Sequence, residues 1–117
     1  MTDLITPALL SAIAARCDDL IALTQDLIRI PTLNPPGRNY LEICEYLAER
    51  LGRAGFKIDL IRAEGAWGDS AAHPRWNLVA RHQGTAPGDC VHFNSHHDVV
   101  EPGHGWTRDP FGAEVEG

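Results

Sequence analysis

The stretch that decides the fold is residues 90–105, which read CVHFNSHHDVVEPGHG. It contains four of the chain's six histidines. The residues over 90–95 predict a short strand, and the glycines and proline that follow predict a loop. Open α/β sheets place their ligands at the ends of strands. The sequence therefore predicts a ligand site where this strand ends.

A His-x-Asp step, His96 and Asp98, stands at the predicted end of the strand. Residues i and i+2 of an extended segment point the same way, so the two side chains project to one side. The Asp98 carboxylate can then accept the proton of one ring nitrogen of His96. That contact fixes the tautomer and leaves the other nitrogen free for a metal ion.

A longer pattern surrounds this step. Ser95–Gly103 (SHHDVVEPG), followed by WTRDPF from Trp106 and EVEG from Glu114, closely resembles the first metal-site motif of the zinc-dependent M20 peptidases. The resemblance extends upstream to Ile30–Gly37 (IPTLNPPG). The family includes acetylornithine deacetylase and succinyl-diaminopimelate desuccinylase, and the motif does not choose between them.

The resemblance implies a site and a reaction. His96 would be a metal ligand in a site with two zinc ions, and Asp98 would be the catalytic residue that orients it. A lone His-x-Asp step would also fit cobalt or manganese. The family's Gly-Arg-Gly-x-x-Asp and Glu-Glu segments, which carry further ligands and the general base, would lie beyond Gly117. The full-length protein would be a homodimeric amidohydrolase that cleaves N-acyl amino acids or small peptides, and residues 1–117 would be inactive alone.

Composition sets limits on function and location. The net charge of -6 argues against a nucleic-acid binder. No apolar run approaches the ~20 residues that cross a bilayer, and no basic segment begins the chain as in a secretory signal. Three widely separated cysteines, Cys17, Cys44 and Cys90, are interpreted as buried thiols of a reducing compartment. These features predict a cytoplasmic protein with no membrane partner.

Two helices are expected first. Thr6 as N-cap and Pro7 at the first helical position predict a helix that continues to Pro31 and packs on the core by an apolar stripe. A second helix is expected to begin with a capping box, Asn39-x-x-Glu42, and to end at Gly52 or Gly55. Its predicted inner face is Tyr40, Cys44, Leu47 and Leu51.

Strands are expected at 56–61, 77–81 and 90–95, with another beginning at 111. Residues 63–75 should form a loop in which Trp67 could serve as an anchor, and the short turn over 83–89 should make the strand at 90–95 antiparallel to its predecessor. The fold class predicted is α/β, with two helices followed by a mixed sheet. The resemblance to the M20 peptidases implies that residues 1–117 are the incomplete N-terminal portion of a three-layer, zinc-exopeptidase-like catalytic domain.

The other polar and aromatic residues near the motif receive structural interpretations. His97 should point away from His96 and pack or face solvent. His92 and Asn94 should be hydrogen-bonded interior groups, and His104 a loop residue. Trp106 and Phe111 should fix the loop against the sheet.

Other functions compete with the hydrolase. A nucleophilic triad of Ser95, His96 and Asp98 fails because adjacent strand residues leave on opposite faces and no G-x-S-x-G elbow is present. A non-catalytic small α+β domain that binds at most one metal weakly stays open. So does a truncated product that is never made as a stable protein.

Overall fold

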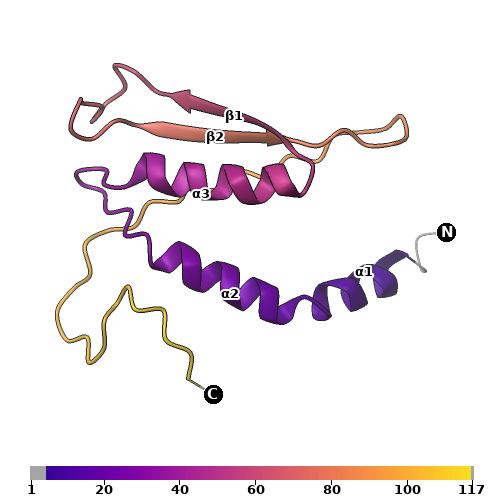
Figure 1. Ribbon diagram of the computed structural model, residues 1–117, viewed down its shortest axis with the longest axis horizontal. Coiled ribbons are helices and arrows are strands. Elements are labelled where there is room, and N and C mark those ends of the chain that lie inside the picture. The colour runs from indigo at the N-terminus through magenta and orange to yellow at the C-terminus, as the bar shows by residue number, and fades with distance from the viewer. Residues whose placement is uncertain (1–4, 117) are drawn as a thin grey trace. The chain divides into compact units, whose positions relative to one another are not determined.

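The computed structural model describes residues 5–116, with side chains from residue 6 onward. The elements, in chain order, are the helices α1 (Ile5–Ala14), α2 (Cys17–Ile28) and α3 (Tyr40–Arg53) and the strands β1 (Lys57–Arg62) and β2 (Trp76–Arg81) (Figure 1). The chain forms two compact units. One contains Ile30–His104, and the other contains the described residues before and after it. The predicted α/β class is confirmed at this level.

The unit formed by Ile30–His104 consists of a helix on a two-stranded sheet. The strands β1 and β2 pair antiparallel, with Lys57 opposite Arg81 and Arg62 opposite Trp76. The helix α3 packs against both strands. Both strands lie within one residue of their predicted bounds, because alternation of apolar and polar residues is a local signal that the sheet preserves. The predicted mixed sheet is wrong, since the described strands form a single antiparallel pair.

Helix α3 carries the core of this unit. The helix has its predicted position, and Tyr40 and Cys44 of its predicted inner face are buried. Ile43, which was not assigned to that face, is 3% exposed. The predicted capping box is wrong, because Asn39 has a positive φ of 57° and its side-chain amide donates to the carbonyl oxygen of Pro31 at 3.0 Å. Asparagine tolerates this left-handed conformation better than most residues.

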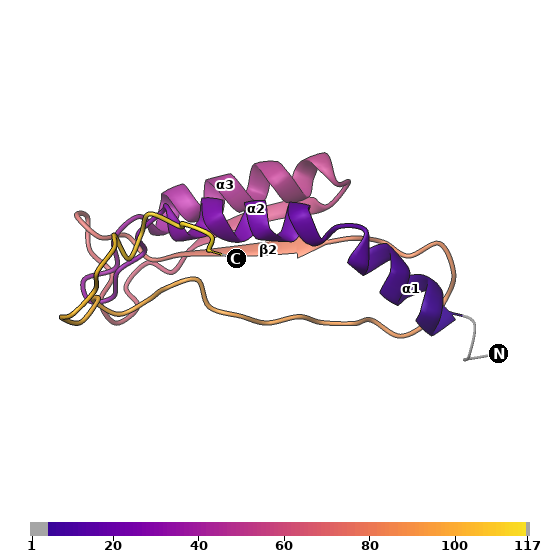
Figure 2. The same ribbon diagram turned by 90° about the horizontal axis from the view of Figure 1, so that it is seen from below.

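The predicted third strand is absent from the described sheet. Residues 90–95 are extended but pair with neither β1 nor β2, and the run leading to them lies apart from the strands in Figure 2. Val91, Phe93, His92 and Asn94 are all exposed, so the interior role predicted for His92 and Asn94 is wrong. Alternation predicts an extended backbone, but a strand also needs a neighbour for its backbone hydrogen bonds.

The other unit contains α1 and α2. The single helix predicted from Thr6 to Pro31 is wrong: it is interrupted at residues 15–16, and Thr6 lies inside α1. Asp18 and Asp19 stand in the first turn of α2, where carboxylates favour a helix N-terminus, which accounts for the restart. The apolar stripe does not form a core, because Leu10, Ile13 and Leu20 are exposed.

Further corrections concern the loops and the cysteines. Residues 63–75 form the predicted loop, but Trp67 is 92% exposed and anchors nothing. The strand expected from 111 is not formed; a turn at 109–112 closes with a bond from the Gly112 amide to the Asp109 carbonyl. Trp106 is exposed and Phe111 half-buried. All three cysteines are free, and of these only Cys44 is buried.

We predict that Ile43→Ala lowers the free energy of unfolding by about 2–5 kcal/mol, because it removes a buried side chain of α3. The matched control is Ile61→Ala on β1, where the side chain is 46% exposed and the loss should not exceed about 1 kcal/mol. Urea denaturation measures both. Equal losses in the two variants would contradict the assignment of this core.

Candidate functional site

The backbone around Asp98 is fixed by the segment 32–34. The amide of Val99 donates to the carbonyl of Thr32 at 2.9 Å, and the amide of Asn34 donates to the carbonyl of Val99 at 2.8 Å. These two bonds form an isolated parallel bridge between Leu33 and Val99. The hydroxyl of Thr32, which is buried, also donates to the carbonyl of His97. The His-x-Asp step is thus tied to a segment more than sixty residues earlier.

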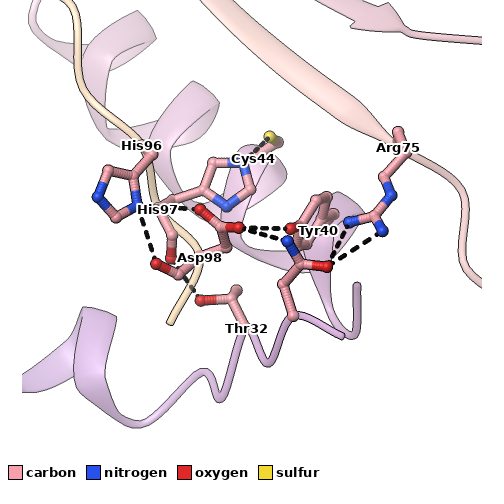
Figure 3. Close-up of polar contacts among 8 residues, drawn as sticks. Thr32, Tyr40, Cys44, Arg75, His96, His97 and Asp98 are labelled. Atoms are coloured by element: carbon pink, nitrogen blue, oxygen red, sulfur yellow. Dashed lines mark hydrogen bonds and ion pairs between the residues drawn. The ribbon is translucent and has the colours of Figure 1, made fainter. Parts of the chain in front are cut away.

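The carboxylate of Asp98 accepts hydrogen bonds on both oxygens. Its Oδ2 accepts from the side-chain amide of Asn34 at 2.8 Å and from the hydroxyl of Tyr40 at 3.0 Å. Its Oδ1 lies 2.9 Å from Nδ1 of His96 (Figure 3). The donors come from three separate segments, so the carboxylate has little freedom to turn.

His96 is arranged as the sequence predicts. Its side chain is 84% exposed, and Nδ1 lies 2.9 Å from both the carboxylate and the carbonyl oxygen of Asp98. An ionised carboxylate and a carbonyl oxygen only accept hydrogen bonds, so Nδ1 must carry the proton. In the neutral ring the lone pair is then on Nε2. Nε2 is therefore the nitrogen that could bind a metal ion.

The hydrogen bonds also set the ionisation of the site. Burial alone would raise the pKa of Asp98, but the bonds from Asn34, Tyr40 and His96 outweigh it and lower that pKa below its ordinary value. Burial raises the pKa of Tyr40 to about 12, and the adjacent Asp98 carboxylate adds to this shift because it accepts a hydrogen bond from the neutral hydroxyl. Asp98 is thus a carboxylate, and Tyr40 a neutral donor, at neutral pH.

His97 occupies a packed position on the opposite side from His96. Its ring meets that of Tyr40 edge to face, with centroids 4.8 Å apart, and its Nε2 lies 3.8 Å from the sulfur of Cys44. Burial raises the pKa of the Cys44 thiol, and the charge of Glu45 adds to that shift. The His97–Cys44 pair fits the packing role predicted for His97.

Asn34 and Arg75 extend the network away from His96. Both terminal nitrogens of the Arg75 guanidinium lie 3.1 Å from Oδ1 of Asn34, and its central carbon lies 4.9 Å from the centroid of the Tyr40 ring. The sequence pointed to neither role. Asn34 belongs to the IPTLNPPG segment that resembles the M20 family, but nothing in that pattern assigned it a contact. For Arg75 no local signal exists, because the hydrogen bonds of its guanidinium to Asn34 join residues 41 positions apart.

His104, in the loop that follows, is exposed. Within residues 5–116, no group of three or more His, Cys, Asp or Glu side chains is placed to hold a metal ion. The described helices include none that is both long and apolar enough to span a bilayer.

Comparison with curated proteins finds succinyl-diaminopimelate desuccinylases among the relatives of this chain. Succinyl-diaminopimelate desuccinylase from Methylobacterium nodulans is 40% identical over 98 residues, which are 82% of this chain and 22% of that protein. The enzymes of the same name from Rhodospirillum rubrum and Methylobacterium radiotolerans are 36% and 39% identical, over 83% and 84% of this chain and 22% and 23% of their own lengths. No family model and no solved structure matches the chain.

The chain thus spans about a fifth of the length of the curated relatives that it matches. The similarity covers most of this chain and concerns enzymes whose name describes removal of an acyl group. The predicted resemblance to M20-type deacylases is therefore confirmed.

The raised pKa of Tyr40 predicts a dependence of stability on pH. Since the folded-state pKa of about 12 exceeds the ordinary value of 10.0, the neutral hydroxyl stabilises the fold below pH 10. That contribution should be lost as the pH rises from 10 toward about 12. In Tyr40→Phe the free energy of unfolding should be lower at neutral pH and should fall less steeply over this window. Urea denaturation of the variant and the parent at a series of pH values tests this. An equal decrease of the free energy of unfolding with pH in the two proteins would contradict it.

Proposed function

On the premise that the chain is a segment of an M20-type deacylase, we propose that it supplies His96 as one metal ligand of the enzyme's active site, with Asp98 as the residue that orients it. The reaction proposed is hydrolysis of the amide bond of an N-acyl amino acid. The names of the relatives favour N-succinyl-diaminopimelate as the substrate.

The observation that carries this proposal is the contact between the two side chains. The 2.9 Å distance between Nδ1 of His96 and Oδ1 of Asp98 reproduces the pairing in which a carboxylate fixes a histidine ligand of a metal. Asp98 is half-buried while the His96 ring is exposed, so the carboxylate is anchored and the imidazole points outward. A purely structural histidine would more often have its ring nitrogens engaged in the interior.

The donor chemistry fits zinc. A neutral imidazole nitrogen is a preferred zinc ligand, and cobalt or manganese would also accept it. When bound, zinc would polarise the scissile carbonyl and lower the pKa of a water molecule toward about 7. We propose two zinc ions in the complete site, with the remaining ligands and the general base supplied by segments outside this chain.

The roles of the chain's own residues follow from the hydrogen bonds. Asp98 keeps the proton of His96 on Nδ1 and so presents the Nε2 lone pair outward. Asn34 and Tyr40 engage the other carboxylate oxygen of Asp98 and prevent its rotation. The exposed position of His96 allows further segments of the protein to approach it.

Three further points belong to the same proposal. We propose that the complete enzyme is a homodimer, as the M20 resemblance implies. We propose a cytoplasmic location, supported by cysteines that are all free. We also propose that residues 1–117 are one portion of the catalytic domain and have no deacylase activity alone, a proposal supported by the share of the relatives that they match.

The test is to read the coding DNA beyond Gly117, express the complete open reading frame, and assay it beside the 117-residue chain. We expect Gly-Arg-Gly-x-x-Asp and Glu-Glu segments, bound zinc by elemental analysis, and release of succinate from N-succinyl-diaminopimelate faster than acetate from N-acetylornithine. A stop codon after Gly117, together with a folded chain that binds metal weakly and cleaves neither substrate, would favour the non-catalytic domain instead.

We predict that Asp98→Asn in the complete enzyme lowers kcat by about 10- to 100-fold and leaves the protein folded, because the amide no longer holds the correct tautomer of His96. Asp89→Asn, at an exposed residue of the segment after β2, is the control and should keep parental kcat. Steady-state kinetics with circular dichroism measures both. Parental turnover in Asp98→Asn would remove the proposed role of this residue.

We also predict that His96→Gln in the complete enzyme lowers the zinc content relative to the parent, whereas His92→Gln keeps the parental zinc content. The two histidines lie four residues apart and both are exposed, but only His96 contacts a carboxylate among the described residues. Elemental analysis after dialysis gives the zinc content of each variant. Equal zinc retention in the two would contradict ligation by His96.

A further inference from the structure

Arg75 lies one residue before β2, and its side chain donates hydrogen bonds to Asn34 of the site. The two terminal nitrogens of Arg75 converge on Oδ1 of Asn34, each at 3.1 Å, while Nδ2 of Asn34 donates to Asp98 at 2.8 Å. The order of contacts is therefore guanidinium, carboxamide, carboxylate, imidazole, and each group is hydrogen-bonded to the next. Figure 3 shows Arg75, Asp98 and His96 of this series.

The chemistry of the two ends fixes the carboxamide between them. A guanidinium only donates hydrogen bonds, and an ionised carboxylate only accepts them. The oxygen of Asn34 must therefore face Arg75, and its NH₂ group must face Asp98. The Asp98 carboxylate already disfavours the reversed amide, whose oxygen would repel it, and Arg75 adds two hydrogen bonds to the same orientation. Arg75 thus holds Asn34 in the orientation in which it donates to Asp98.

The surroundings of Arg75 hold its guanidinium in one place. Its backbone amide donates to Oδ1 of Asp69 at 2.9 Å, and its carbonyl accepts from the amide of Ala63 at 2.9 Å. The guanidinium lies over the ring of Tyr40. It also lies against Gly37 and Gly68: a Cβ at either glycine would collide with its terminal nitrogens.

Packing alone does not explain this arginine. Its Nε is buried without a hydrogen-bond partner among the described residues, which costs free energy that an apolar side chain would not. Two terminal nitrogens converging on one oxygen give instead a directional contact that lysine cannot reproduce.

We propose that Arg75 is a positioning residue for the site: through Asn34 it locks the Asp98 carboxylate so that His96 keeps its proton on Nδ1. As a statement about catalysis this rests on the proposed function. As a statement about the tautomer of His96 it stands on the contacts alone and is testable without metal.

The first test is Arg75→Met in the metal-free 117-residue chain, with the His96 tautomer read from the ¹⁵N shifts of its neutral ring. Arg75→Met should reduce the ratio of the Nδ1–H to the Nε2–H form by about five- to tenfold. This is the effect expected from losing one hydrogen bond, that from Asn34 to Asp98. Arg75→Lys keeps the positive charge but has only one terminal nitrogen, so its tautomer ratio should lie between those of the parent and of Arg75→Met. Arg81→Met is the control: Arg81 ends β2, pairs with exposed Asp59, and should leave the ratio unchanged.

A double-mutant cycle separates positioning from a general loss of structure. If Arg75 acts through Asn34, Arg75→Met should have no further effect on the tautomer ratio in an Asn34→Ala background. Additive effects in the cycle, or a folded Arg75→Met chain with the parental ratio, would overturn the proposal.

A second pair of variants tests the placement of the guanidinium without changing Arg75. Gly68 and Gly65 both have positive φ, +80° and +73°, so alanine strains the backbone at either position. Only at Gly68 would the added Cβ meet Arg75, since nothing lies within 4 Å at Gly65. Gly68→Ala should therefore shift the His96 tautomer and Gly65→Ala should not; equal shifts would count against the proposal.

The outcomes distinguish this proposal from the proposed function. If Arg75→Met shifts the tautomer while the complete protein binds no zinc and cleaves no substrate, Arg75 positions His96 and the deacylase assignment fails. If the complete protein is an active zinc deacylase but the tautomer and kcat are unaffected by Arg75→Met, the deacylase assignment holds and the positioning role is overturned.

Discussion

The arrangement of the unit formed by Ile30–His104 depends on one carboxylate, that of Asp98. A partly buried anion is stable only when donors replace the water that it has lost. Here the donors come from the segment after Ile30, from the first residue of α3, and from the neighbouring imidazole. Two parts of the chain that are distant in sequence, residues 34–40 and 96–98, are thereby brought to one point, and each constrains the other.

The helix α3 gives this point its rigidity. Tyr40 is the first residue of the helix and is buried, so its hydroxyl is carried by an element that is itself packed on the sheet. The bridge between Leu33 and Val99 adds a second attachment that does not depend on any side chain. The outward-facing imidazole of His96 is therefore the exposed part of the site, whereas the carboxylate that holds it is half-buried.

Local patterns predicted the local features of this structure. The strands β1 and β2, the helix α3 and the contact between His96 and Asp98 all arise from spacings of two to four residues, which a sequence displays directly. The strand expected at 90–95 was wrong because a strand also requires a partner. The roles of Asn34, Tyr40 and Arg75 could not be predicted, because their contacts join residues forty or more positions apart.

The extended, unpaired run at 90–95 has a consequence for how the chain behaves in solution. It displays backbone groups without strand partners beside exposed Val91 and Phe93, the latter 89% exposed. Such a segment is a template onto which another extended peptide can add, and two copies of the chain offer it to each other. Produced in isolation, the chain should tend to self-associate through this run, and a charged residue introduced at Phe93 would be the simplest way to keep it monomeric.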